Sequence, residues 1–211
     1  MLSKKSIVAA LALSFVASGA MADAIPYPNA GSYNTATYSF TAAADGDVVA
    51  YIVGGFGAGF ENELGLMING VQTAEGFGLN NHLSSVGDSF NLGFAHAGDT
   101  LTFILHNITL GKDAYSDPSM NGSYDDPSAI GNNHIYSTNY TATSPVFSGV
   151  PAGIYVAFED LPFPDSDFNY DDESFVFGNV VLTPGNGVPE PASIALIGAG
   201  LAGLWPRRRR A

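Results

Sequence analysis

The chain has 211 residues, no cysteine and a formal net charge of −13 at pH 7, and 46% of its residues are hydrophobic. Six of the seven basic residues lie in the two end segments, so residues 23–187 carry 19 acidic side chains against one lysine, a net charge of −18. Such a surface repels nucleic acid and anionic lipid and attracts cations. The absence of cysteine excludes disulfides and thiol nucleophiles, so stability must come from packing, with bound metal as a further source.

The first 22 residues have the pattern of a secretory signal peptide. Two lysines precede an apolar run at residues 7–16, and a small-x-small sequence, Ala-Met-Ala, ends at Ala22. We expect passage through the Sec translocon and cleavage after Ala22 by signal peptidase, so that the mature chain begins at Asp23. Residues 23–187 then number 165, which is enough for one domain with a sizeable core.

Apolar and polar residues alternate with a period of two through most of this body, as in half-buried strands, and no helical stripe is evident. Strands are predicted at residues 38–42, 48–53, 64–68, 90–94, 101–105, 154–158 and 174–182. The dipeptide Asn69-Gly70 predicts a hairpin, because both residues tolerate the positive φ of a type I′ turn. Short strands with glycine-rich turns predict an all-β fold, a single antiparallel β-sandwich or jelly roll over residues 23–183, followed by a linker at 184–187.

Residues 112–133 interrupt the alternation. This stretch is crowded with Asp, Asn, Ser, Gly and Pro, which indicates a long surface loop. One interpretation is a hydrated loop without a specific role. The other is a binding loop, since β scaffolds carry recognition on their loops.

Residues 159–173 are the most acidic stretch, with seven carboxylates among fifteen residues and no basic residue. So many like charges would repel one another and raise their pKa values unless a cation lies between them. Oxygen ligands favour a hard ion, and Ca²⁺ tolerates the irregular geometry of a loop better than Mg²⁺ does. The predicted ligands are Glu159, Asp160, Asp165, Asp167, Asn169, Asp171 and Asp172.

The spacing within this stretch predicts how the ligands are presented. Every second residue from Asp165 to Asp171 carries an oxygen ligand, so in an extended segment these side chains share one side, whereas Phe168 and Tyr170 point toward a core. The spacing does not fit an EF-hand, because Tyr170 and Val176 occupy the sixth and twelfth places that require glycine and glutamate. The alternative is a solvated acidic loop that binds ions adventitiously.

The acidic stretch also resembles the ending of a domain of unknown function that is common in secreted bacterial proteins, which reads roughly E-D-L, a gap, then D-x-D-Y-N-D. The residues that match this pattern are Glu159, Asp160, Asp167 and Asp172. Asn169 and Asp171 are amide-acid exchanges that keep a ligand oxygen and are compatible with calcium. The segments around His82, His96 and His134 are also similar to members of this group.

The tail, residues 188–211, has three ordered parts: V-P-E-P, an apolar run of 14 residues at 192–205, and an arginine cluster at 207–210. As a helix the run would span roughly 21 Å, short of the roughly 30 Å hydrocarbon layer, which predicts a thin or temporary membrane span. The arginines would stay on the cytoplasmic side. The two prolines keep the preceding segment extended, as a processing enzyme requires.

These parts resemble the PEP-CTERM sorting signal of Gram-negative bacteria, which an exosortase in the inner membrane recognises. The resemblance implies that sorting and processing depend on Pro189, Glu190, Pro191, Arg207, Arg208, Arg209 and Arg210. The dipeptide Trp205-Pro206 departs from the usual pattern without removing any part. The resemblance further implies transient residence in the inner membrane, then the outer surface or the exopolysaccharide of a biofilm matrix.

No catalytic motif is evident. The chain has no G-x-S-x-G and no H-E-x-x-H sequence, and its four histidines are scattered. We therefore expect an exported, calcium-stabilised structural or binding module rather than an enzyme, without a nucleic-acid partner. The alternative is a secreted polysaccharide-active hydrolase, because glycoside hydrolysis needs only two carboxylates at a suitable separation.

Overall fold

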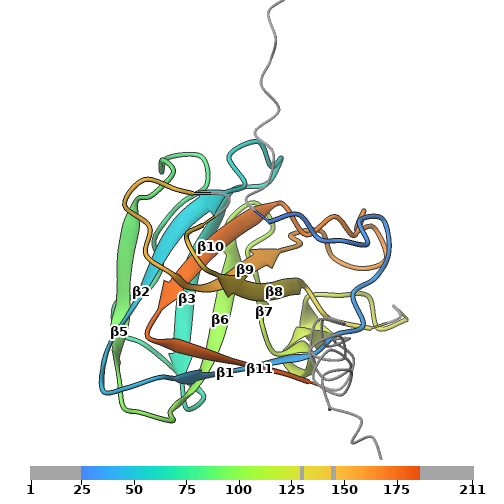
Figure 1. Ribbon diagram of the computed structural model, residues 1–211. Coiled ribbons are helices and arrows are strands. Elements are labelled where there is room, and N and C mark those ends of the chain that lie inside the picture. The colour runs from blue at the N-terminus through green and yellow to red at the C-terminus, as the bar shows by residue number, and fades with distance from the viewer. Residues whose placement is uncertain (1–24, 129–130, 144–145, 186–211) are drawn as a thin grey trace, which may run out of the picture.

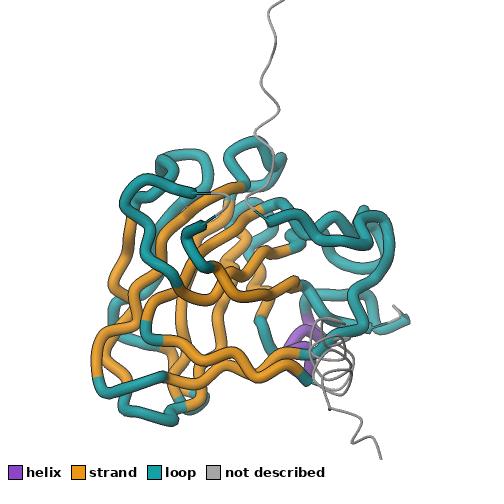
Figure 2. The backbone as a smooth tube through the Cα atoms, viewed as in Figure 1, coloured by secondary structure: helices purple, strands orange, loops and turns teal. Residues whose placement is uncertain are grey.

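The computed structural model describes residues 25–128, 131–143 and 146–185, which form two antiparallel sheets lying face to face (Figures 1 and 2). The six-stranded sheet contains β1 (Tyr38–Ala42), β3 (Asn62–Ile68), β4 (Val71–Gln72), β6 (Thr100–Asn107), β7 (Lys112–Tyr115) and β11 (Val180–Pro184). The five-stranded sheet contains β2 (Gly46–Gly54), β5 (Ser89–Ala95), β8 (Ile135–Tyr140), β9 (Gly153–Phe158) and β10 (Glu173–Gly178). The predicted all-β class is confirmed.

The main core lies between the two sheets. Alternate residues of the strands point inward, so Phe103 of β6 stacks on Phe177 of β10 with 3.8 Å between ring centroids, and both side chains are fully buried. Phe40 of β1 packs against Phe103 at 4.9 Å. Burying one such side chain contributes about 1.5–3 kcal/mol. The apolar residues that recur with a period of two in the sequence are thus the residues that form the core between the sheets.

Consecutive strands pair only in β3-β4, β6-β7, β8-β9 and β9-β10, and at every other connection the chain passes from one sheet to the other. The six-stranded sheet has the order β11-β1-β6-β3-β4, with β7 also paired to β6, and the five-stranded sheet has the order β5-β2-β10-β9-β8. The stretches predicted at 38–42, 48–53, 64–68, 90–94, 101–105 and 154–158 lie in β1, β2, β3, β5, β6 and β9. The hairpin between β3 and β4 turns at Asn69 and Gly70, with φ of 50° and 82°, as predicted.

The predicted strand at 174–182 is in fact two strands in different sheets. The chain changes sheet at Asn179, whose φ is 59°, so β10 pairs with β2 and β9 whereas β11 pairs with β1. The Asn179 side chain holds the crossing by accepting from Ala44 N (2.9 Å) and donating to the carbonyls of Ala44 (3.0 Å) and Gly46 (3.2 Å). The alternation continues through the break, so periodicity alone does not reveal it.

The prediction of a long surface loop at 112–133 is wrong for its first half. That half forms β7 and the 3-10 helix η1 (Pro118–Ser123). The buried Asn121 organises it by accepting from Tyr115 N (2.7 Å) and donating to the carbonyls of Tyr115 and Asn132, each at 2.9 Å. Polar residues order this stretch through internal hydrogen bonds, which composition cannot distinguish from hydration. β8 is likewise a strand that apolar alternation did not predict.

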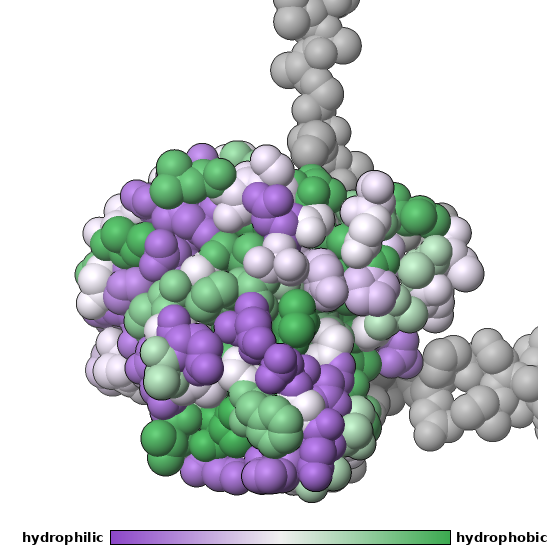
Figure 3. Space-filling view, turned by 90° about the vertical axis from the view of Figure 1, so that its left-hand side faces the viewer, coloured by the Kyte–Doolittle hydropathy of each residue, from purple (hydrophilic) through white to green (hydrophobic). Residues whose placement is uncertain are grey.

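The five-stranded sheet also carries a smaller apolar cluster on its outer face. Val53, Tyr155 and Val176 pack there against the chain that follows β8, including Val150 and the partly buried Phe147. On the side of the molecule nearest β5, by contrast, hydrophilic and hydrophobic residues are interspersed at the surface (Figure 3). The β9–β10 region is therefore enclosed on both faces, which buries the residues at its ends.

The signal peptide at 1–22, the second half of the linker at 184–187 and the sorting tail with its apolar run lie outside the described residues. β11 reaches Pro184, where the linker was expected to begin, and Gly185 N bonds to Thr37 O at 2.7 Å. No helix among residues 25–128, 131–143 and 146–185 has the length and apolarity of a membrane span.

Candidate cation site and two surface grooves

The acidic stretch connects β9 to β10, and its two ends meet. Phe158 pairs with Glu173 in the sheet, and Asp172 N bonds to Phe158 O at 3.2 Å, so the residues just inside both ends lie together. Glu159 and Glu173 are 0% exposed and Asp160 is 3% exposed. We call the four acids Glu159, Asp160, Asp172 and Glu173 the loop root. Two strand ends therefore concentrate negative charge in a buried region.

Two of the loop-root carboxylates have no hydrogen-bond partner. Both side-chain oxygens of Glu159 and both of Glu173 are buried and unbonded. The Ser166 hydroxyl and the backbone N–H groups of Leu161 and Tyr170 lie near enough to Glu159 to lower its pKa, but not in bonding geometry. A buried charge costs several kcal/mol unless it is paired or loses its charge. These two side chains must therefore be neutral or compensated by a cation.

The other two loop-root carboxylates have donors within the protein. Asn62 Nδ2 donates to Asp160 Oδ2 at 2.8 Å, and Asp160 N donates to Asp172 Oδ2 at 2.9 Å. The Asp160 carbonyl accepts from the Tyr124 hydroxyl and from Asn107 Nδ2 (3.2 Å). The six-stranded sheet thus positions Asp160 through Asn62 and Asn107, which lie opposite each other on β3 and β6.

The loop-root carboxyls hold their protons unusually tightly. Burial raises the pKa of Glu159 to about 7, and the negative charge of Asp167 adds to the rise. Burial also raises the pKa of Asp172 to about 9, with Asp160 and Glu159 adding to it. The pKa of Glu173 is raised well above its ordinary value, by burial first and by neighbouring carboxylates second. Near neutral pH, the region therefore takes up protons unless a cation supplies the positive charge.

A buried histidine supports the loop from the opposite side. His134 Nε2 lies 2.8 Å from Asp125 Oδ1, and its Nδ1 lies 2.8 Å from Glu159 O. The ring stacks on Phe163 at 4.2 Å, and Phe163 N donates to Asp125 Oδ1 at 2.8 Å. His134 is thus a packed, hydrogen-bonded residue that fixes the start of the loop.

The middle of the loop is not the extended segment that the spacing predicted. Phe168 and Tyr170 both have φ of 56°, in the left-handed region. Asp167 bonds to Asn169 N (3.2 Å) and Nδ2 (3.0 Å), and Asn169 Oδ1 accepts from Asp171 N (3.1 Å). These local bonds compete with an extended conformation. Tyr170 is buried as predicted, at 1% exposure, whereas Phe168 is only partly buried.

The predicted ligands consequently fall into two groups. Glu159 and Asp160 are buried and Asp172 is partly buried at the root, whereas Asp165 and Asp167 are exposed and Asn169 and Asp171 are partly exposed. Only Asp167 among the exposed group acts on the charge of Glu159. Sequence reasoning missed Glu173 and Asn62 as members of the site. Glu173 belongs to the acidic run, but it was not chosen as a ligand, and the structure shows that it is the first residue of β10.

The donor chemistry of the loop root fits a hard divalent cation. The side chains offer oxygen only, and those of Glu159 and Glu173 have no competing partner in the protein. Across residues 25–128, 131–143 and 146–185, no three His, Asp or Glu side chains are gathered closely enough to hold one metal ion. Binding would therefore require carboxylate side chains to rotate toward one another.

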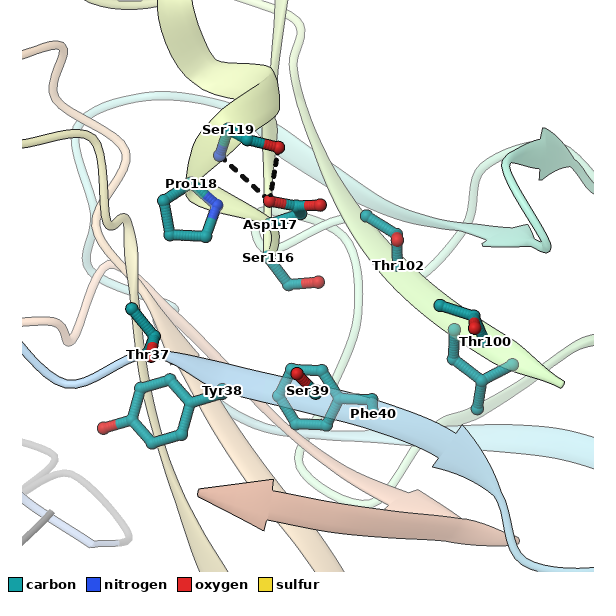
Figure 4. A pocket seen from close by; sticks show the side chains of 11 residues that line it. Thr37, Tyr38, Ser39, Phe40, Thr100, Thr102, Ser116, Asp117, Pro118 and Ser119 are labelled. Carbon is teal, nitrogen blue, oxygen red and sulfur yellow. Dashed lines mark hydrogen bonds between the residues drawn. The ribbon is translucent and has the colours of Figure 1, made fainter. Parts of the chain in front are cut away.

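A groove of about 400 Å³ lies on the six-stranded sheet where β1 and β6 diverge (Figure 4). Hydroxyl side chains dominate its lining, from Thr37, Ser39, Thr100, Thr102, Ser116 and Ser119. Asp117 stands opposite β1, and its Oδ1 accepts from Ser119 N (2.9 Å) and Oγ (2.7 Å), the two dashed lines in Figure 4. The only carboxylate in this groove thus already has donors.

A second groove, of about 480 Å³, lies between the N-terminal segment and β8. Its lining contains four tyrosines together with amide and hydroxyl side chains. The tyrosines are Tyr27, Tyr33, Tyr38 and Tyr136. This groove borders the acidic loop, because Tyr27 packs on Tyr170 with 4.8 Å between ring centroids.

A protein-family model matches the C-terminal end of the chain. Residues 187–210 match the PEP-CTERM protein-sorting motif, which confirms the sorting signal predicted at 188–211. The motif implies exosortase-dependent sorting of an exported protein to the cell surface. Searches of curated proteins and of solved structures found no match. The predicted processing residues, Ala22, Pro189, Glu190, Pro191 and Arg207 to Arg210, lie outside the described residues, and the resemblance of the body to a secreted domain stays a prediction.

Proposed function

We propose that this chain, which carries a PEP-CTERM sorting motif, is an exported β-sandwich protein of a Gram-negative bacterium that acts as a calcium-stabilised structural or binding module. It leaves the cytoplasm through the Sec translocon and loses its signal peptide after Ala22. It resides transiently in the inner membrane until exosortase processes the tail. Its destination is the outer surface or the exopolysaccharide matrix.

The observation that carries the calcium part of the proposal is the pair of buried glutamates without hydrogen-bond partners. Glu159 and Glu173 leave four carboxylate oxygens unbonded at the loop root, beside two further acids. A divalent cation would supply the charge that this region lacks. Glu159, Glu173, Asp160 and Asp172 would hold it, with Asp167 reaching in from the loop. Its role is to tie the two ends of the β9–β10 connection together.

Thermal unfolding of the exported protein in EDTA and in millimolar Ca²⁺ tests this site. At 100 times its Kd, calcium adds about 2.7 kcal/mol to the free energy of unfolding, which raises Tm by about 5–10 °C for a domain of this size. Mg²⁺ at the same concentration should give a smaller shift, because it resists the irregular geometry of a loop.

A matched pair of variants separates this site from general charge screening. Glu159→Gln removes a buried, unbonded carboxylate and should reduce the calcium shift strongly. Glu75→Gln removes an exposed carboxylate elsewhere on the chain and should leave the shift unchanged. Superimposable melting curves of wild type in EDTA and in Ca²⁺ would rule the calcium site out.

The sorting part of the proposal rests on the motif match alone and is tested separately. Cells that express wild type or Glu190→Ala are fractionated, and the mass and location of the protein are compared. We expect the wild type to lose its tail and reach the surface, and the variant to accumulate in the inner membrane with its tail intact. Identical masses and locations for the two proteins would contradict exosortase processing through this motif.

The proposal assigns no catalysis to the protein, and this too has a direct test. The protein is incubated with neutral and acidic polysaccharides, and the release of reducing ends is measured against a heat-denatured sample. We expect no release above that background. Turnover would support the alternative class, a secreted polysaccharide-active hydrolase.

A further inference from the structure

The second groove joins segments that lie about a hundred residues apart in the chain. One wall is the segment 27–38 before and at the start of β1, and the other is β8, which is an edge strand of its sheet. Asn34 Nδ2 bonds to Ile135 O at 2.9 Å, which fixes the two walls to each other. Between them lies an open cavity of about 480 Å³. This volume is in the range of small-molecule and cofactor sites.

The lining combines aromatic rings with neutral polar groups. Tyr27 packs on Tyr136 with 5.3 Å between ring centroids, and Tyr33 and Tyr136 remain partly exposed. Accessible amides and hydroxyls come from Asn29, Ser32, Thr35 and Thr138, whereas Asn34 and Ser137 are buried and already donate to Ile135 O and Tyr155 O. No side chain in the lining is a Lys, Arg, His, Asp or Glu. The lining of this groove therefore carries no formal charge, although residues 23–187 have a net charge of −18.

We propose that this groove binds a neutral polysaccharide chain. The apolar face of a sugar ring packs on a partly exposed aromatic ring, while its hydroxyls exchange hydrogen bonds with amide and hydroxyl side chains. Tyrosine suits this role because it presents a large, amphipathic surface with few rotatable bonds. The proposal deepens the proposed function by naming the ligand class of the binding module, and it rests on that function.

Charge selects against the other polymers that a surface protein meets. The acidic body repels anionic polysaccharides and nucleic acid over a distance. A cationic ligand finds no carboxylate in the groove to pair with. A neutral polysaccharide is not repelled by the acidic body and needs no carboxylate partner in the groove.

The geometry also connects this groove to the loop root. The Tyr170 hydroxyl accepts from Asn34 N at 2.9 Å and donates to Asn133 O at 3.2 Å, and Gly31 N donates to Phe168 O at 3.0 Å. The segment that forms one wall of the groove is therefore held by the acidic loop. Order in the acidic loop therefore also fixes the position of this wall of the second groove.

The test is a binding measurement on the exported protein in millimolar Ca²⁺. The probes are dextran, laminarin and galactomannan as neutral polymers, with alginate and dextran sulfate as anionic ones, in affinity electrophoresis. We expect retardation by at least one neutral polymer and by neither anionic polymer. Failure of all the neutral polymers to retard the protein, or retardation by the anionic ones instead, overturns the proposal.

Variants then locate the binding. Tyr136→Ala should weaken binding about tenfold, as for the loss of one aromatic contact, whereas Tyr136→Phe keeps the ring and should stay within about threefold of wild type. Ser39→Ala, in the first groove, serves as the control and should bind like wild type. Equal binding by Tyr136→Ala and Ser39→Ala would place the ligand elsewhere and overturn the assignment.

Two further measurements keep the outcome decisive. If Tyr136→Ala does not fold, Asn29→Ala alters an exposed lining residue and should weaken binding by a smaller factor, while unchanged binding contradicts the proposal. The calcium shift in Tm is measured on the same variants. Lost binding with a normal calcium shift isolates the groove, whereas a missing calcium shift with intact binding refutes only the calcium site.

Discussion

Acidic side chains have opposite environments at the β3–β4 turn and at the loop root. At the β3–β4 end, the partly exposed Asp99 accepts from Asn69 Nδ2 (2.8 Å) and His96 N (2.7 Å), and these bonds lower its pKa. At the loop root, Glu159 and Glu173 are buried without partners and their pKa values are raised. At the β3–β4 turn, both carboxylate oxygens of Asp99 thus have hydrogen-bond donors within the protein. The loop root leaves the carboxylate oxygens of Glu159 and Glu173 buried without hydrogen-bond partners, which is the basis of the proposed cation site.

The largest expected effect is the pH dependence of stability in EDTA. Because the folded pKa of Glu159 is about 7, against 4.5 for the ordinary group, the folded state binds the extra proton between these values. The contribution of Glu159 to the free energy of unfolding is therefore fully present below pH 4.5. It is lost as pH rises through 7, and the loss from Glu159 alone is about 3 kcal/mol. Asp172, with a pKa of about 9, extends the fall.

Denaturant unfolding at pH 5 to 9 in EDTA measures this course, and the same series in Ca²⁺ is its control. Bound calcium should flatten the fall, because the ion stabilises the charged carboxylates. A free energy of unfolding that rises between pH 5 and 8 in EDTA would show that the loop root behaves like Asp99 after all.

A smaller effect is expected from neutralising one loop-root acid. In EDTA at pH 8, Glu159→Gln should raise the free energy of unfolding by about 1–3 kcal/mol, because it removes a charge that folding buries. Most buried substitutions destabilise, so the sign itself is the test. The gain should vanish at pH 5, where the wild-type carboxyl is protonated, and Glu75→Gln should change nothing at either pH. A loss of stability at pH 8 would argue that Glu159 has a partner.

The smallest effect is expected at the β3–β4 turn. Asn69→Ala removes the amide that donates to Asp99 and accepts from Thr100 N, and it places alanine, which tolerates the left-handed region less well than asparagine, at φ of 50°; this should cost about 1 kcal/mol. Asn69→Gly tolerates that φ and should cost less. Thermal melts of both variants should show the same calcium shift as wild type. A changed calcium shift would mean that the two ends of the strands are energetically coupled.

Much of the fold could be predicted because strand periodicity is local. Most strands and the Asn69-Gly70 hairpin follow from alternation and turn chemistry within a few residues. The break at Asn179 and the ordering of residues 112–123 did not follow, because each depends on hydrogen bonds within polar stretches. The acidic stretch was identified, but its exposed and buried members could not be separated without knowing where β9 and β10 pair.

The sequence by itself determined the PEP-CTERM sorting signal, the all-β class and the concentration of acids at residues 159–173. Each of these is written in consecutive residues, through composition, periodicity or a motif. Only the tertiary structure decided that Glu173 joins Glu159 at a buried root and that the segment 27–38 meets β8 to form a tyrosine-lined groove. Burial and partnership depend on pairing between distant segments, and no local pattern contains that information.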